Sequence, residues 1–144
     1  MVTKKERLER LGSVRLFAGL NKTDLKYLLD ISRIVYHDEG HTIIHEGDRG
    51  AGFQLILDGE ARVVRGGRTA VRLGPGEFFG EMALIDEGPR TATVIAITPM
   101  TTRGIAAWDF RALVKSRPEM AWRLLVHMTG RLREAQKRED MLRA

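Results

Sequence analysis

The chain has no cysteine and no long apolar run among its 144 residues. Without cysteine it cannot form a disulfide framework, use a thiol in catalysis, or bind zinc or an iron–sulfur cluster through sulfur. Its apolar runs, such as Phe53–Leu57 and Val94–Ile97, are far shorter than the ~20 residues of a transmembrane helix. The charged N-terminal segment also lacks the apolar stretch of a signal peptide. We therefore expect a cytoplasmic protein of one domain, without a membrane segment.

The chain carries a moderate excess of positive charge. There are 24 lysines and arginines against 19 aspartates and glutamates, which gives a net charge of +5 and a pI near 10.0. A basic balance permits an anionic partner but does not identify one, because net charge governs solubility and non-specific attraction. The position of the charges is therefore more informative than their sum.

Residues 1–32 have the periodicity of helices. Leucines and Phe17 recur at helical spacing, with a break around Gly19. Asn21 is suited to cap a second helix, and Asp24 then lies in the first turn, where the helix dipole favours a negative charge. We expect two short helices in this zone.

Residues 33–106 have instead the character of short strands. Segments rich in β-branched and aromatic residues alternate with glycine-containing turns. Asp58-Gly59 and Gly66-Gly67 each predict a two-residue hairpin, because both central residues need a positive φ. Six or more strands with frequent turns indicate a mainly β fold: an antiparallel jelly-roll barrel, or double-stranded β-helix, flanked by helices.

Residues 107–142 are helical again and are expected to form a hinge and a lid. One short helix is predicted over Trp108–Val114, and Ser116 with Glu119 forms a capping box for a longer one. The longer helix carries an apolar stripe that we expect to be core or lid, formed by Ala121, Trp122, Leu124, Leu125, Met128, Leu132 and Ala135. Because its end extends past a barrel of this size, we expect a homodimer through this helix.

The segment between Gly74 and Val94 interrupts the strand pattern. Gly80 allows a close backbone turn, and Glu81–Ile85 has the composition of one or two helical turns. The first N–H groups of such a turn point outward and form an anion site. In this chain these groups belong to Met82, Ala83 and Leu84.

Two charged residues complete this pattern. Arg90, after Gly88-Pro89, suits bidentate recognition of a phosphate. Glu81 is an acceptor beside the anion site, so it suits a neighbouring hydroxyl donor such as a ribose 2′-OH. The segment therefore predicts a site for a phosphorylated ligand that carries a hydroxyl.

At these residues the chain resembles the cyclic-nucleotide-binding domain family, the cAMP- or cGMP-binding regulatory domains of catabolite activators and protein-kinase regulatory subunits. Phe79–Leu84 followed by Pro89–Val94 is similar to the phosphate-binding cassette of that family, which would occupy residues 79–92. The resemblance extends to Leu16–Leu20, Glu46–Asp48 and Leu57–Glu60, and covers about residues 8–132.

The resemblance implies a role for each matching residue. Glu81 would accept the ribose 2′-OH, and Arg90 would pair with the cyclic phosphate. Thr91 would bond to the phosphate or the base edge, which leaves cAMP, the preferred ligand, and cGMP both open. The complete ligand set would be Phe79, Gly80, Glu81, Met82, Ala83, Arg90, Thr91 and Ala92, with lid positions at Arg131, Ala135 and Gln136. No cofactor or metal is implied, only the nucleotide.

The sequence leaves three other interpretations of its charged residues open. Arg90 and Glu81 could form an ion pair without a ligand. His41, His45 and Glu46 could bind a metal in a jelly-roll enzyme. Four arginines around the Gly66-Gly67 hairpin could be a solvated face or a docking patch for an acidic partner: Arg62, Arg65, Arg68 and Arg72. DNA binding by this chain alone is not expected, because regulators of this family usually read DNA through an appended helix-turn-helix module.

The sequence thus predicts a sensor that binds a cyclic purine mononucleotide and responds by moving its C-terminal helix. Catalysis is not expected, because no nucleophile–base pair or metal cage can be assembled; His127 is expected to be packed or exposed. The alternatives are a protein-interaction or dimerisation module with a vestigial site, and a regulatory piece of a longer transcription factor, channel or enzyme. The protein effector is unknown.

Overall fold

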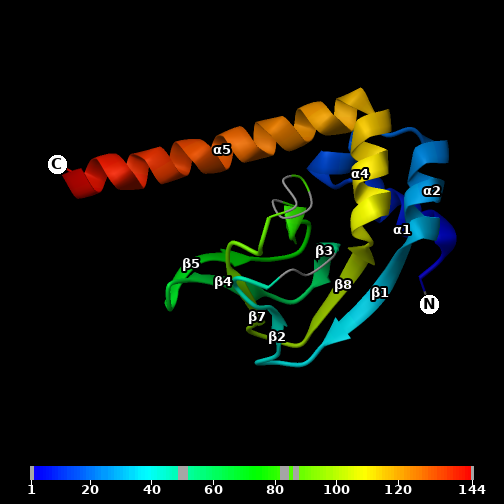
Figure 1. Ribbon diagram of the computed structural model, residues 1–144. Coiled ribbons are helices and arrows are strands. Elements are labelled where there is room, and N and C mark those ends of the chain that lie inside the picture. The colour runs from blue at the N-terminus through cyan, green and yellow to red at the C-terminus, as the bar shows by residue number, and fades with distance from the viewer. Residues whose placement is uncertain (1, 49–51, 82–84, 86–87, 144) are drawn as a thin grey trace.

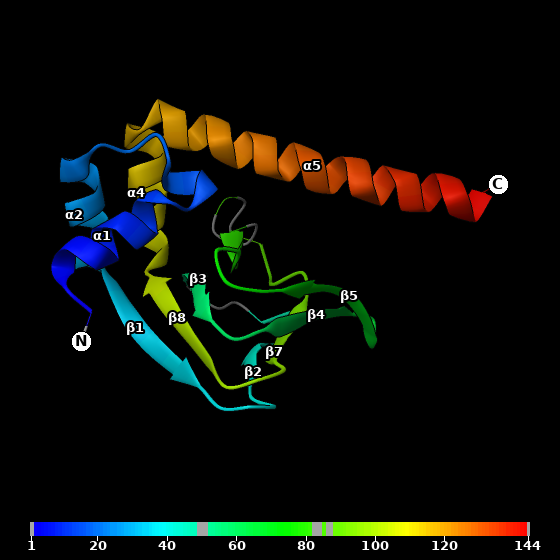
Figure 2. The same cartoon turned by 180° about the vertical axis from the view of Figure 1, so that it is seen from behind.

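The structure is a computed structural model, and it describes residues 2–48, 52–81, 85 and 88–143. Two four-stranded antiparallel sheets form the body, with helices along one side (Figures 1 and 2). The helices are α1 (Lys4–Gly12), the 3-10 turn η1 (Arg15–Phe17), α2 (Lys22–Ile31), α4 (Ala107–Ser116) and α5 (Pro118–Arg143). The strands are β1 (Ser32–His37), β2 (Thr42–Ile44), β3 (Phe53–Asp58), β4 (Ala61–Arg65), β5 (Arg68–Leu73), β6 (Phe78–Phe79), β7 (Thr93–Ala96) and β8 (Met100–Ile105). The mainly β, jelly-roll-like fold class with flanking helices is confirmed.

The strand order explains why one predicted hairpin is present and the other is not. The sheets have the orders β1-β8-β3-β6 and β2-β7-β4-β5. Gly66 and Gly67 join β4 to β5 with φ of 57° and 78°, as the hairpin prediction requires. The prediction for Asp58-Gly59 is wrong, because β3 and β4 lie in different sheets. Gly59 has a φ of 91° at this crossing, where a side chain would collide with the Pro99 carbonyl.

The apolar interior is divided into two clusters. One lies between the helices and β3, where Phe53 stacks on Phe110 with ring centroids 4.6 Å apart. The other lies between the sheets and includes Ile56, Phe79 and Val94. The second cluster forms the floor beneath the interrupted segment, so the two sheets fix the position of the residues around it.

Polar side chains join the N-terminal helices to the rest of the molecule. Asn21 caps α2 as predicted, with its side chain accepting from the Asp24 backbone N–H at 2.9 Å. The buried Asp24 carboxylate also accepts from Arg117, at 2.8 Å from Nε, between α4 and α5. The Arg117 guanidinium therefore holds the pKa of Asp24 below its usual value. Arg10 of α1 donates to the Leu57 carbonyl at the end of β3.

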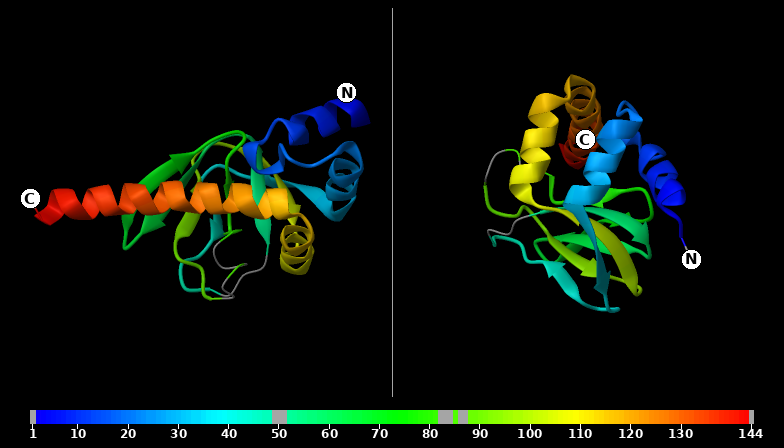
Figure 3. Two further views of the ribbon diagram at one scale, coloured as in Figure 1. Left: turned by 90° about the horizontal axis from the view of Figure 1, so that it is seen from above. Right: turned by 90° about the vertical axis from the view of Figure 1, so that its right-hand side faces the viewer.

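The C-terminal helices correct two predictions. Ser116 does not cap α5; it ends α4, and its hydroxyl donates to the Leu113 carbonyl. Helix α5 spans 26 residues and runs past the barrel (Figure 3), but only Met120 and Leu124 on it are buried. The predicted apolar stripe is instead largely exposed, with Trp122 at 63%, Leu125 at 58% and Leu132 at 60%. The helix touches the body at its first turns and only sparsely beyond them.

Within the described ranges, no helix combines the length and the apolar character needed to cross a bilayer.

Candidate functional site

Arg90 is held by backbone atoms on both sides of its guanidinium. Its Nη1 donates to the Gly80 carbonyl at 2.9 Å and its Nη2 to the Gly52 carbonyl at 3.1 Å. Its own backbone pairs with the preceding loop, through Arg90 N to Asp48 O at 2.9 Å and Gly47 N to Arg90 O at 2.8 Å. The side chain is 6% exposed, and burial lowers its pKa while the Glu81 carboxylate opposes that effect. The guanidinium is therefore positioned before any ligand arrives.

Arg90 retains hydrogen-bonding capacity in this position. A guanidinium has five N–H donors, and the two carbonyls engage only some of them. Its Nε is buried and finds no acceptor among the residues that the structure describes. A buried, unsatisfied cationic donor is costly unless an acceptor completes it, so the site fits an anion that can accept from a planar donor.

Glu81 is met by a side chain of α5 rather than by Arg90. The carboxylate is 2% exposed and accepts from Arg131 Nη1 at 2.6 Å. His127, one turn earlier on α5, has its Nε2 3.8 Å from the same carboxylate, and its ring packs at a tilt against Phe78 with centroids 4.4 Å apart. Burial lowers the pKa of His127, although Glu81 acts in the opposite direction. The simple Arg90–Glu81 ion pair is therefore not the arrangement found, and α5 closes the site through Glu81.

Two cavities lie around these residues, and they share the lining residues Arg65, Leu73, Thr91 and Arg131. The inner one, of about 40 Å³, is bordered by Phe79, Gly80, Glu81, Arg90, Thr91, Ala92 and Arg131. The outer one, of about 1080 Å³, lies between the β4–β5 hairpin and α5. The inner cavity is thus smaller than the usual small-molecule site of about 300–1,000 Å³, and Arg131 lines both cavities.

The structure brings most of the predicted ligand residues together. Phe79, Gly80, Glu81, Arg90, Thr91 and Ala92 all border the inner cavity. Met82 and Ala83, with the expected helical turn that contains them, lie outside the described residues. Of the lid positions, Arg131 borders both cavities and Ala135 borders the outer one, whereas Gln136 is exposed and borders neither.

Among the residues that the structure describes, the histidines form no metal-binding arrangement. His41 and His45 flank β2 rather than sharing a strand face, and His41 stacks on His37 with ring centroids 5.8 Å apart. His37 Nε2 lies 3.1 Å from both Gln54 Oε1 and Thr102 Oγ1. Across the described part of the chain, no three His, Asp or Glu side chains gather as metal ligands. The His41, His45 and Glu46 interpretation has no geometric support.

Comparison with known proteins bears on the same residues. A sequence model described as the cyclic nucleotide-binding domain matches residues 34–117. This match includes Glu81 and Arg90 and spans more than half of the chain. The chain belongs to the cyclic nucleotide-binding domain family.

Individual relatives agree with this assignment. The cyclic AMP receptor protein of Thermus thermophilus is 36% identical over 132 residues, which cover 88% of this chain and 61% of that protein. The cAMP-dependent protein kinase regulatory subunit of Schizosaccharomyces pombe is 42% identical over 89 residues, 61% of this chain and 22% of that protein. A crystal structure of the Thermus thermophilus catabolite activator protein has a TM-score of 0.80 at 35% identity, covering 89% of this chain and 62% of its own. The chain thus spans less than two thirds of these proteins.

Sequence reasoning missed two contacts of this cyclic nucleotide-binding domain. His127 packs against Phe78, in agreement with the expectation that it is packed or exposed, but its approach to Glu81, one turn before Arg131, was not predicted. The four-residue interval between them places both on one helix face, which could have indicated the contact. Arg65 was grouped with the solvated hairpin, but it borders both cavities. A side chain at the end of β4 gives no sequence signal for facing α5.

Proposed function

We propose that this domain binds a cyclic purine mononucleotide, with cAMP preferred over cGMP, and that binding changes the position of α5. The observation that carries the proposal is the pre-positioned Arg90, held by the Gly80 and Gly52 carbonyls with a buried Nε left without a described acceptor. A cyclic phosphate would supply acceptors to this guanidinium. Membership of the family and the names of the two relatives support the choice of ligand.

The roles of the remaining site residues follow from a phosphate bound at Arg90. Glu81 would accept the ribose 2′-OH, Thr91 would bond to the phosphate or base edge, and Phe79 and Ala92 would form the floor. Arg131 currently occupies the Glu81 carboxylate, so the ribose hydroxyl would compete with it. Ligand binding would thereby break or re-form the Glu81–Arg131 contact between the barrel and α5. The position of the helix would then depend on whether the ligand is bound.

The exposed stripe on α5 supports a homodimer as part of this function. Leu125, Met128, Leu132 and Ala135 recur at intervals of three and four residues, as in a two-stranded coiled coil. Leu125 and Leu132 are more than half exposed, and Leu142 is 87% exposed. A second copy of α5 would cover this surface, and the dimer would pass the ligand signal to an effector. No catalytic step is proposed for the chain.

Calorimetric titration of the purified, nucleotide-free chain with cAMP and cGMP tests the proposal. We expect one of them to bind, and Arg90→Ala to weaken binding by ~10²-fold, because charge-assisted hydrogen bonds contribute about 1.5–3 kcal/mol each. Arg72→Ala, which removes a charge from the outer side of the hairpin, serves as the control and should bind normally. No heat with either nucleotide, from a chain that melts cooperatively, would refute the sensor function and favour a protein-docking module.

A further inference from the structure

The volumes of the two cavities indicate where the base of a bound nucleotide would lie. The inner cavity, beside Arg90 and Glu81, measures about 40 Å³, whereas small-molecule sites usually measure about 300–1,000 Å³. The outer cavity measures about 1080 Å³ and lies between the β4–β5 hairpin and α5. A nucleotide with its phosphate at Arg90 and its ribose at Glu81 would therefore place its base in the outer cavity, next to the residues that line both cavities.

Among the residues that line both cavities, Arg65 carries the guanidinium that is not already engaged. Leu73 offers the base an apolar contact and Thr91 offers a hydroxyl, while Arg131 donates to the Glu81 carboxylate at 2.6 Å. Arg65 forms no ion pair or hydrogen bond with the residues that the structure describes. Its side chain is half-buried, and burial is the main cause that lowers its pKa. Donors that are withdrawn from water in this way are stabilised by an acceptor.

The position of Arg65 on its strand explains why it faces the cavities. Alternate residues of a strand point to the same side of a sheet, so Arg65 shares its side of β4 with Val63, which is buried between the sheets. Val64 pairs with Thr93 of β7, and one residue further along Arg65 comes level with Ala92. Ala92 lines the inner cavity. Arg65 therefore occupies an inward position of β4, which an apolar side chain would ordinarily fill.

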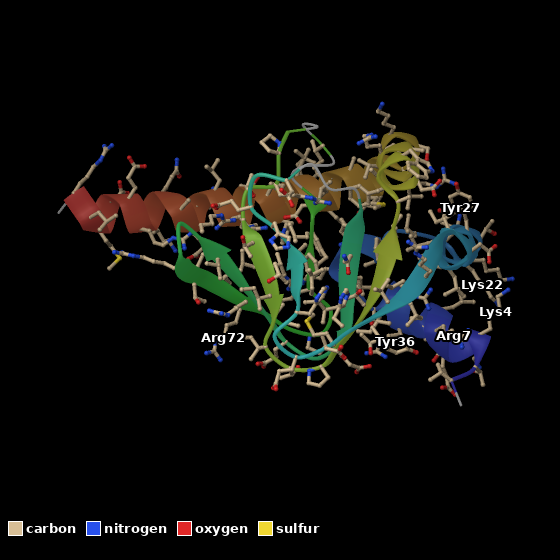
Figure 4. All side chains as sticks on the ribbon, turned by 60° about the horizontal axis from the view of Figure 1, so that its bottom comes forward. Lys4, Arg7, Lys22, Tyr27, Tyr36 and Arg72 are labelled. Carbon is tan, nitrogen blue, oxygen red and sulfur yellow. The ribbon has the colours of Figure 1, made fainter. Side chains whose placement is uncertain are left out.

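The other arginines of the hairpin are placed differently. Arg62, Arg68 and Arg72 are exposed and line neither cavity. Arg72 points away from α5 (Figure 4). Water satisfies the donors of such exposed side chains, whereas the donors of Arg65 face the space that remains for the base.

We infer that Arg65 is a specificity-determining residue, which donates hydrogen bonds to O6 and N7 of a guanine base in the outer cavity. These two acceptors lie side by side on guanine, and a planar guanidinium donates to both at once. Adenine offers N7 as an acceptor, but its neighbouring 6-amino group is a donor and cannot accept from Arg65. The inference rests on the proposed function and refines it: Arg65 raises the affinity for cGMP and so narrows the preference for cAMP.

Calorimetry on the purified, nucleotide-free chain tests this role with three ligands: cAMP, cGMP and cyclic IMP. Cyclic IMP keeps O6 and N7 but lacks the 2-amino group of guanine. Arg65→Met removes the guanidinium and keeps an unbranched side chain, while Arg65→Lys keeps the charge without the planar pair of donors. Arg72→Met is the matched control, because it removes an exposed arginine of the same hairpin. Thermal melts establish that each variant is folded, and Arg65→Lys alone suffices if Arg65→Met does not fold.

The expected result is a loss that depends on the base. We expect Arg65→Met to weaken cGMP and cyclic IMP about tenfold and cAMP by less than about threefold, because a bidentate contact discriminates between bases by about this factor. Arg65→Lys should give the same order of losses, since a point charge does not donate two parallel hydrogen bonds. Arg72→Met should change none of the three affinities.

Other outcomes separate this inference from the proposed function. If nucleotides bind through Arg90 but the Arg65 variants weaken cAMP and cGMP equally or not at all, base selection by Arg65 is refuted and the sensor function stands. A loss with cGMP but not with cyclic IMP would also refute it, because the 2-amino group would then be the group recognised. Full cGMP affinity in Arg65→Lys would show that charge alone suffices and would overturn the bidentate contact. If no nucleotide binds the unaltered chain, the sensor function and the inference both fail.

Discussion

The barrel and α5 supply the candidate site in different ways. Arg90 is buried in the barrel, with two backbone carbonyls and a pinned main chain fixing its direction. Arg131 reaches Glu81 from a helix on which only the first two turns bury residues. The barrel half of the site is thus determined by sheet geometry, and the helical half by a few side-chain contacts. The helical half of the site is therefore held by fewer contacts than the barrel half.

The sharpest test of this contrast compares neighbouring leucines of α5. Leu124 is 4% exposed and Leu125 is 58% exposed. We expect Leu124→Ala to lower the free energy of unfolding by roughly 2–5 kcal/mol, as for other buried leucines, and Leu125→Ala to change that of the isolated chain by less than about 0.5 kcal/mol. Urea denaturation at low protein concentration measures both. Equal losses in the free energy of unfolding for the two variants would show that α5 packs on the barrel through a different face.

A second test concerns the backbone of the barrel half. Gly80 has a φ of 96°, and a Cβ there would lie 2.5 Å from the Gly52 carbonyl and 3.0 Å from Arg90 Nη1. We expect Gly80→Ala to destabilise the fold by roughly 2–3 kcal/mol and to weaken nucleotide binding at least about tenfold. Gly76→Ala is the control, since its φ is 87° but no atom lies within 4 Å of the added carbon. It should cost about 1–2 kcal/mol in backbone strain and leave affinity unchanged; equal affinity losses would contradict the argument.

The third test breaks the contact between the two halves. In Arg131→Gln the buried Glu81 carboxylate loses its charged donor, which we expect to cost about 1 kcal/mol after allowance for the partial exposure of Arg131. Amide hydrogen exchange in residues 125–143 should then accelerate about fivefold. Arg133→Gln should leave exchange unchanged. If exchange in α5 is the same in all three proteins, the Glu81–Arg131 contact does not hold the helix.

The smallest expected effect concerns the junction from which α5 starts. Because the pKa of Asp24 is lowered in the folded state by Arg117, the unfolded chain binds a proton more readily at that carboxylate. The stabilising contribution of the Asp24 carboxylate is therefore complete at a pH above its unfolded pKa near 3.8. It is lost as the pH falls through the lower pKa of the folded state. Asp24→Asn should melt below the unaltered chain at pH 7, and the difference should shrink below about pH 4. A difference independent of pH would contradict the ion pair.

The sequence was informative where local chemistry decides structure. The Asn21 cap and the Gly66-Gly67 hairpin follow from the preferences of those residues, and the fold class follows from strand and turn spacing. Asp58-Gly59 failed as a hairpin because its positive φ serves a crossing between sheets, and sheet membership depends on distant partners such as β7 and β8.

Less of the candidate site than of the fold could be predicted from the sequence. Glu81, Arg90 and Thr91 are close in sequence, so their juxtaposition could be predicted, whereas Arg65 and His127 come from elements that meet only in the fold. The apolar stripe of α5 was predicted to be buried because periodicity identifies a face but not what covers it. Met128, Leu132 and Ala135 of that face line the open outer cavity instead of packing against the barrel.

The length of α5 determines how far its C-terminal end moves when its few contacts with the rest of the molecule change. With 26 residues it measures about 39 Å from first turn to last. A tilt of about 10° at the Arg117 junction would move the distal end by about 7 Å, although the atoms at the junction would shift by only a fraction of that. A small rotation at the junction beside Asp24 would therefore be amplified along the helix. A rearrangement of one ion pair at the junction would thus produce a much larger displacement at the C-terminal end of α5.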